Sequence, residues 1–168
     1  MQEIVIREAQ SEDAEKVIIF TKQIGGESEN LSYGSEGLAM SPEQEMYFLN
    51  SMKEDAHSVF FTAWQGSELV GTANLSGLSR RMGHRAELGI AVAKAEWGKG
   101  IGSSLMNVII EYARKNGIEI ISLEVRADNT RAIHLYKKFD FKSIGIMPAF
   151  FKIGSEYIDF QLMYLDLR

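Results

Sequence analysis

The chain has 168 residues, of which 45% are hydrophobic and 24% charged, a composition typical of one globular domain, here residues 1–168. A formal net charge of −5 argues against a nucleic-acid partner. The absence of cysteine excludes disulfides, thiolate metal sites and a cysteine nucleophile, and the three histidines lack metal-ligand spacing, so we expect no metal.

The first half of the chain predicts a strand, two helices and then a run of strands. Ser11 is placed to cap a helix that runs to about Gln23, and the polar, glycine-rich residues 25–37 that follow predict a loop or a broken helix. Ser41, Pro42 and Gln44 form the capping box of a second helix, with proline at its first position. The expected strands of this half are residues 3–9, 57–64, 69–79 and 84–93.

The second half alternates helices and strands. A helix begins near Gly100, has apolar residues at helical spacing, and ends at Gly117. The apolar run 118–125 predicts a central strand covered on both faces. A second helix is expected at 129–139, followed by two strands that turn at 154–155. This order predicts an α/β fold with a mixed sheet, antiparallel at its start, with one crossover after the glycines.

The glycines before the third helix are the strongest functional signal. Gly98, Gly100 and Gly102 permit a tight turn and a close ligand approach, and a helix N-terminus offers unpaired N–H groups. With Lys99 nearby, they predict a phosphate site, and an ordinary strand-to-helix turn is the alternative. The spacing fits neither the Walker loop nor the dinucleotide fingerprint, which argues against a nucleotide-dependent phosphotransferase.

Three ordered segments carry a family resemblance: AELGIAV, WGKGIG and LEVRADNTRAIHLYKKFDF. Together they resemble the GNAT superfamily of N-acetyltransferases, and the second is similar to its acetyl-CoA signature [Q/R]-x-x-G-x-[G/A]. Trp97 departs from that signature by removing a polar side chain, and Asp140, where the family commonly has glycine, is expected to alter a turn. The resemblance covers nearly the whole chain. It implies a central mixed sheet of about seven strands with four flanking helices.

The resemblance also implies acetyl-CoA as the acetyl donor and an amine as the acceptor. Backbone N–H groups of the glycine loop would bind the pyrophosphate, and the pantetheine arm would pair with the strand edge at 88–92, where the strand would diverge from its neighbour. The residues expected to bind acetyl-CoA are Ile90, Ala91, Val92, Trp97, Gly98, Lys99, Gly100, Ile101, Gly102, Ser103, Asn129, Ala132 and Tyr136.

Acetyl transfer to an amine needs a base and gains from an acid. Glu87 is the candidate base because it lies in the strand that leads to the pantetheine edge; an outward-facing surface glutamate is the alternative, and Glu124 is a second candidate. Tyr136 is the candidate acid, supported by the family match of N-x-x-A-I-x-L-Y, with a core aromatic as the alternative. Asn129 is also placed to cap its helix.

The acceptor is left open. By the resemblance, residues 25–44 and 147–159 would form its site, and their carboxylates would either attract a cationic amine or merely be solvated. A polyamine, an aminoglycoside-like amine or a protein N-terminus would fit. The alternative function is a non-catalytic acetyl-CoA-binding sensor or scaffold, and a homodimer is a further expectation. The acids concerned are Glu27, Glu29, Glu36, Glu156 and Asp159.

No membrane partner is expected, and the predicted location is cytoplasmic. The N-terminal residues carry acids and lack the long apolar core of a signal peptide. No apolar run reaches the roughly 18 residues of a transmembrane helix.

Overall fold

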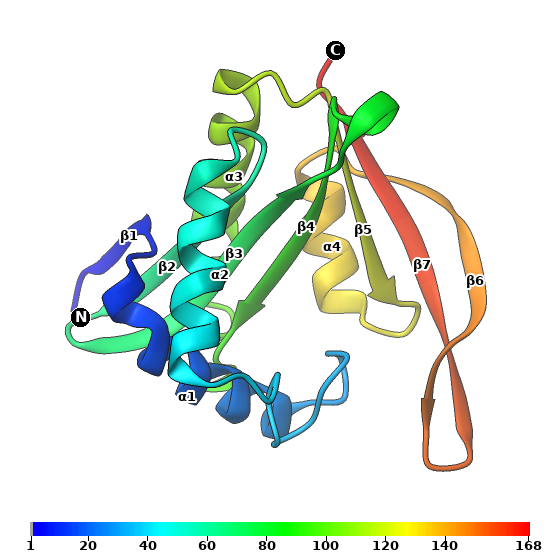
Figure 1. The fold of residues 1–168 in the computed structure, drawn as a ribbon. Coiled ribbons are helices and arrows are strands. Elements are labelled where there is room, and N and C mark those ends of the chain that lie inside the picture. The colour runs from blue at the N-terminus through cyan, green and yellow to red at the C-terminus, as the bar shows by residue number, and fades with distance from the viewer. Residues whose placement is uncertain (1) are drawn as a thin grey trace.

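A computed structural model describes residues 2–168 and shows a seven-stranded sheet between two layers of helices (Figure 1). The sheet order is β1-β2-β3-β4-β5-β7-β6, and every neighbouring pair is antiparallel except β4 and β5. The predicted mixed α/β class with seven strands and four helices is therefore confirmed. The strands are β1 Ile4–Glu8, β2 Val59–Gln65, β3 Glu68–Gly77, β4 Arg85–Val92, β5 Ile120–Arg126, β6 Lys142–Ile153 and β7 Glu156–Asp166.

Two helices cover each face of the sheet. Figure 1 shows α2 in front of the strands and α3 behind them. Leu105 and Ile109 of α3 are completely buried against β2, β3 and β5, in the same cluster as Tyr136 of α4. On the other face, Phe20 of α1 and Leu49 of α2 are buried in separate, smaller clusters. The helices are α1 Ala14–Glu27, α2 Pro42–Glu54, α3 Ile101–Lys115 and α4 Thr130–Lys138.

Local sequence signals fix several helix ends. The Ser41 hydroxyl accepts from the Gln44 amide at 3.2 Å and the Gln44 side chain accepts from the Ser41 amide at 2.8 Å, which completes the predicted capping box of α2. Gly117 follows α3 with a φ of 73°, in the left-handed region that a helix C-terminus favours.

The start and end of α1 differ from the prediction. Ser11 is not the cap: it begins a 3₁₀ turn, Ser11–Asp13, whose capping box joins Gln10 and Asp13. At its other end α1 continues past the predicted end near Gln23 and through Gly25, in the segment for which the sequence predicted a loop or a broken helix. A side chain at Gly25 would collide with the carbonyl of Gly34, so tertiary packing, rather than a turn, requires glycine here.

The prediction that the strand at 118–125 is covered on both faces is wrong, because only one face of β5 is covered. Leu123 and Val125 are buried beneath α3 and α4, while Ser122 is half-buried and Glu124 exposed on the other face. Buried and less buried side chains therefore alternate along β5 with a period of two residues, although the sequence of this strand is an apolar run. Asp140 has a left-handed φ of 67°, and the expected change in its turn stays a prediction.

β6 is an edge strand with an irregular register and an exposed surface. Its pairing with β7 shifts between Ser143 and Gly145 and again between Met147 and Phe151. Ile144, Ile146 and Met147 are exposed, which is compatible with the predicted homodimer, and that dimer stays a prediction. Within residues 2–168, no helix is long and apolar enough to span a membrane.

Candidate active site

The central feature of the site is the divergence of β4 from β5. The two parallel strands pair only from Arg85–Ile120 to Glu87–Ser122, although both continue beyond that point. β5 remains fully paired with β7, and β4 remains paired with β3 as far as Val92. One edge of β4 after Glu87 is therefore left without a strand partner, at the position that the family resemblance implied.

The hydrogen-bond alternation of β4 identifies which backbone groups face this gap. Arg85 accepts from the Leu78 amide and Ala93 donates to the Val70 carbonyl, so odd-numbered residues point their backbone groups at β3. Even-numbered residues face the other way. The Leu88 carbonyl, both groups of Ile90 and the Val92 N–H consequently face the gap. Ala91 does not, because its backbone faces Thr72 of β3.

The glycine loop lies at the end of this free edge. Gly98 and Gly100 have φ values of 78° and 85°, and a side chain at either would meet nothing within 4 Å. Gly102 is different, because a Cβ there would lie 3.2 Å from Leu135 of α4. None of the six N–H groups from 98 to 103 donates to another group in residues 2–168, and they meet at the N-terminus of α3. Such a loop fits an anion in both shape and charge.

Trp97 and its neighbours fasten the loop to the sheet and to α4. The indole N–H donates to the Val92 carbonyl at 2.8 Å, so Trp97 keeps a polar role despite its departure from the signature. The guanidinium of Arg131 lies 4.3 Å from the centre of the indole ring. Lys99 forms an ion pair with Glu96 at 3.0 Å. The loop is thus held by side chains while its amides stay free.

The two candidate bases face the same side of the sheet. Glu87 lies opposite Ser122 in the last paired row, and Glu124 is two residues further along β5. Burial raises the pKa of Glu124, and the nearby charge of Glu87 raises it further. Neither carboxylate forms a hydrogen bond or an ion pair with another residue of the described chain. The pair thus presents two unneutralised acids beside the gap.

Tyr136 approaches from the opposite face. Its side chain is only 7% exposed and packs against Phe141 with ring centres 5.8 Å apart. Burial raises the pKa of its hydroxyl, which therefore stays protonated in neutral solution. The hydroxyl has no hydrogen-bond partner in the protein. Among residues 2–168, every side-chain polar atom that is fully shielded from solvent has such a partner, so the Tyr136 oxygen must be accessible to solvent.

Known proteins resemble the chain in sequence and in structure. Residues 27–141 match the Acetyltransferase (GNAT) family. The chain belongs to the GNAT family of acetyltransferases. The resemblance inferred from the three sequence segments is therefore confirmed.

Individual GNAT relatives agree with this assignment. A structure of a GNAT-family acetyltransferase from Streptococcus pneumoniae superposes with a TM-score of 0.95 at 28% identity, covering 99% of this chain and 100% of that one. YncA from Salmonella typhimurium, solved with acetyl-CoA, shares the fold with a TM-score of 0.86 at 17% identity, covering 98% of this chain and 94% of that one. The N-alpha-acetyltransferase RimI of Mycobacterium tuberculosis is 33% identical over 99 residues, 58% of this chain and 61% of RimI. The matched region is less than two thirds of the length of that relative.

The helix after β5 holds the remaining predicted residues. Asn129 caps α4 through a 3.3 Å bond from the Ala132 amide to its side-chain oxygen, as predicted. Lys138 donates to the Ser103 hydroxyl at 3.1 Å, which brings a cation to the glycine loop from the last turn of α4. The position of Arg131 depends on how α4 packs against α3, and no sequence signal links it to the loop. For Lys137 and Lys138 the sequence allows either ion pairs with phosphates or a solvated helix face, and the contact with Ser103 places Lys138 at the loop.

The predicted acceptor segments come together only in part. Arg126 of β5 contacts the loop between α1 and α2, donating to the Glu29 carbonyl at 3.2 Å. Glu27 instead accepts from the Lys94 amide at 2.8 Å and closes the start of the glycine loop. Glu36 accepts from the Gly34 amide and Asp159 from the Ala149 amide, so both hold their own turns. Glu156 is exposed in the β6–β7 hairpin.

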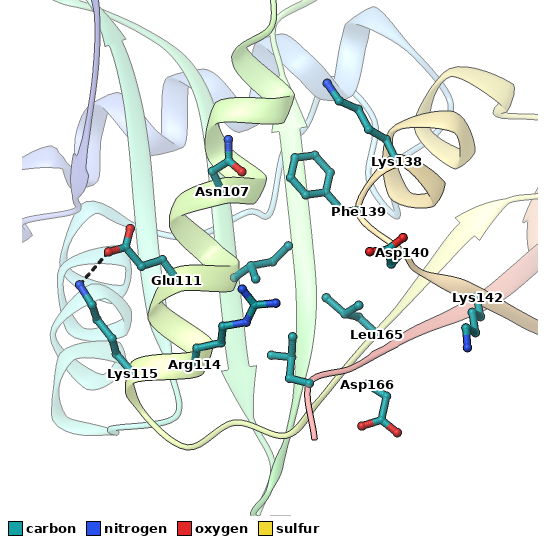
Figure 2. Close-up of a pocket in the computed structure, with 12 residues that line it drawn as sticks. Asn107, Glu111, Arg114, Lys115, Lys138, Phe139, Asp140, Lys142, Leu165 and Asp166 are labelled. Carbon is teal, nitrogen blue, oxygen red and sulfur yellow. Dashed lines mark hydrogen bonds and ion pairs between the residues drawn. The ribbon is translucent and has the colours of Figure 1, made fainter.

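A separate hollow of about 810 Å³ lies between the C-terminal half of α3 and the ends of α4 and β7 (Figure 2). Arg114, Lys115 and Lys142 line it together with Glu111, Asp140 and Asp166, so its charges are mixed. No residue predicted to bind acetyl-CoA or to catalyse transfer lies in it. The diverging strands therefore remain the candidate site. Across residues 2–168, no group of three acids or histidines is arranged to hold a metal ion.

Proposed function

We propose that the protein transfers an acetyl group from acetyl-CoA to an amine in a ternary complex. The observation that carries this proposal is the free edge of β4 after Glu87, which is followed, beyond the 3₁₀ turn Lys94–Glu96, by a loop of unpartnered amides. Family membership supplies the reaction class, and this edge is where the chain's own residues would perform it.

The free edge and the loop fit the two parts of the donor. The pantetheine arm carries amides, which can pair with the backbone groups of Leu88, Ile90 and Val92 as an added strand would. The pyrophosphate fits the amides of 98–103, where Gly98 and Gly100 leave open space and Lys138 lies nearby. Ala91 contributes no backbone hydrogen bond to this edge, since its groups face β3.

Glu87 and Tyr136 lie on opposite faces of the sheet, on either side of the gap. With the thioester of acetyl-CoA held in the gap, the acceptor amine would approach it from the face that carries Glu87. The hydroxyl of Tyr136 would approach it from the opposite face. Glu87 takes a proton from the ammonium, directly or through water, so that the neutral nitrogen can attack the carbonyl carbon. A C–N bond forms and the C–S bond breaks.

Tyr136 donates its proton to the departing sulfur and is reprotonated from solvent, while the nitrogen releases its second proton to water and Glu87 returns the first proton to solvent. The net products are the amide, the free thiol and one proton. Because the hydroxyl has no protein partner, it is available for this hydrogen bond.

Thiol release in the presence of a broad amine panel tests the proposal. We expect thiol to accumulate only when both acetyl-CoA and a suitable amine are present, with stoichiometric acetylated amine. Binding of acetyl-CoA without thiol release, for every amine and for peptide N-termini, would instead establish the non-catalytic sensor or scaffold. Sedimentation velocity on the same sample tests the predicted homodimer.

A further inference from the structure

Asn74 of β3 reaches across Gly89 of β4, close to the free edge. The two residues lie opposite each other in the antiparallel pair, so their side-chain positions share one face of the sheet. A Cβ at Gly89 would lie only 2.6 Å from the Asn74 Oδ1 oxygen. The Asn74 carboxamide therefore occupies the space that a side chain at position 89 would fill.

Glycine at position 89 provides room and does not serve a turn. Gly89 lies in the middle of β4, and its φ is outside the left-handed region. The three atoms nearest to a Cβ at this position all belong to the end of the Asn74 side chain. The missing side chain thus allows the Asn74 carboxamide to lie over the strand.

This contact lies beside the proposed reaction centre. Gly89 is two residues after Glu87 on the same face of β4, at the level where β4 has lost its pairing with β5. Ser76, which lies opposite Glu87, accepts a 3.4 Å hydrogen bond from the Asn74 Nδ2. The carboxamide is therefore positioned between the row of the candidate base and the free edge of β4.

The Asn74 Oδ1 oxygen has no hydrogen-bond partner in residues 2–168, although Nδ2 is bonded to Ser76. Asn74 is half-buried, and every fully shielded side-chain polar atom in that range has a partner, so Oδ1 is accessible to solvent. A carboxamide oxygen carries no hydrogen and can only accept. The thioester oxygen and sulfur are also acceptors, so they cannot bond to Oδ1. The acceptor nitrogen is a donor, and in the proposed reaction it approaches from this face.

We propose that the Asn74 Oδ1 oxygen accepts a hydrogen bond from the attacking nitrogen of the acceptor and directs its lone pair toward the thioester in the gap. This inference rests on the proposed acetyl transfer and adds a residue to it. Glu87 takes one proton from the ammonium, and a remaining N–H then points at Asn74, which leaves the lone pair facing the gap. Asn74 itself neither gains nor loses a proton.

Asn74→Leu tests this role because it keeps a side chain of similar size and removes the hydrogen-bonding atoms. With the fastest amine of the panel, we expect kcat to fall about 10- to 100-fold, the effect of one lost hydrogen bond to a group that becomes charged. Acetyl-CoA affinity and melting temperature should stay close to those of the wild type. Asn74→Asp retains an acceptor oxygen at the same point, so kcat at its own pH optimum should stay within about 5-fold of the wild type.

Thr72→Val is the matched control, because Thr72 lies one row away on the same face of β3 and loses a polar group at nearly constant volume. Its kcat should not change.

Gly89→Ala tests the same contact without altering Asn74. Only the end of a flexible side chain lies in the way, so the new methyl group should displace the carboxamide and leave the strand folded. We expect a similar loss of kcat. The variant that combines Gly89→Ala with Asn74→Leu should be little slower than either alone, because both changes remove one contact. Losses that multiply in the combined variant would contradict the proposed role of this contact.

The outcomes separate this inference from the proposed function. Failure of every amine to release thiol with the unaltered protein refutes the transfer reaction, and the role of Asn74 with it. Turnover by the wild type with an undiminished kcat in Asn74→Leu refutes the role of Asn74 alone. Equal losses in Asn74→Leu and Asn74→Asp would also overturn it, because the oxygen would then make no difference. A loss of acetyl-CoA affinity at constant kcat would assign Oδ1 to the donor.

Discussion

The indole N–H of Trp97 donates a 2.8 Å hydrogen bond to the carbonyl of Val92. Val92 ends the free edge of β4, and Trp97 begins the glycine loop, so this bond fixes the edge and the loop relative to each other. It also uses the last edge carbonyl, which leaves the Val92 N–H as the final edge group free to bind a ligand. The two halves of the proposed acetyl-CoA site are therefore positioned before any ligand arrives.

Gly100→Ala should weaken acetyl-CoA binding by about 10-fold or more, because the new methyl group would enter the open space beside the loop amides. The left-handed φ of 85° should also cost about 1–2 kcal/mol of folding stability. Gly117→Ala is the control, since Gly117 has a φ of 73° and equally open surroundings at the other end of α3. It should lose similar stability and no affinity. Calorimetry and thermal unfolding measure both, and equal affinities in the two variants would contradict the assignment.

Tyr136→Phe should lower turnover by roughly 10²–10⁴ while acetyl-CoA affinity and stability barely change, because only an unpartnered hydroxyl is lost. Tyr112→Phe should behave in the opposite way. The Tyr112 hydroxyl donates to the carbonyls of Ala56 and Ser58 at 3.0 Å, so its loss should cost about 1–3 kcal/mol without slowing the reaction. A wild-type rate in Tyr136→Phe would assign that ring to packing alone.

Glu87→Gln should reduce kcat/KM at neutral pH, where the acceptor is protonated, by roughly 10²–10⁴. The loss should shrink as the pH rises, because a growing fraction of the amine is then already neutral. Glu124→Gln, two residues beyond the paired row on β5, should lose less than about 10-fold. A pH–rate profile of each variant decides between them: a larger loss in Glu124→Gln would exchange their roles.

Asp13→Asn should destabilise the fold at neutral pH by about 1–2 kcal/mol, since Asp13 accepts two bonds from Arg7, at 2.7 and 2.8 Å, and one from the Gln10 amide. The Arg7 hydrogen bonds hold the pKa of Asp13 below its ordinary 3.8. This stabilisation is present above pH 3.8, and it is lost as the pH falls through the lower pKa that Asp13 has in the folded state.

Denaturant unfolding at pH 7 and at acidic pH should show the difference between wild type and Asp13→Asn narrowing below pH 3.8. Asp128→Asn is the control for an exposed pair, and its effect should stay within about 0.5 kcal/mol. A difference that does not change with pH would show that the ion pair is not its source.

Local chemistry in the sequence determined most of the fold. The capping box at Ser41, the left-handed Gly117 and the two hairpin turns depend on neighbours within a few residues, and each is found as predicted. The glycine loop with its two flanking segments was also sufficient to identify the family, because their order and spacing are properties of the chain itself.

The tertiary structure decided which faces and edges are free. The uncovered face of β5, the divergence after Glu87 and the continuation of α1 through Gly25 all follow from which elements pack together. Asn74 shows the same dependence: the sequence placed it in a strand, but only the pairing of β3 with β4 brings its carboxamide over Gly89. Contacts between distant segments carry no local signature, since burial and charge compensation depend on residues far apart in the chain.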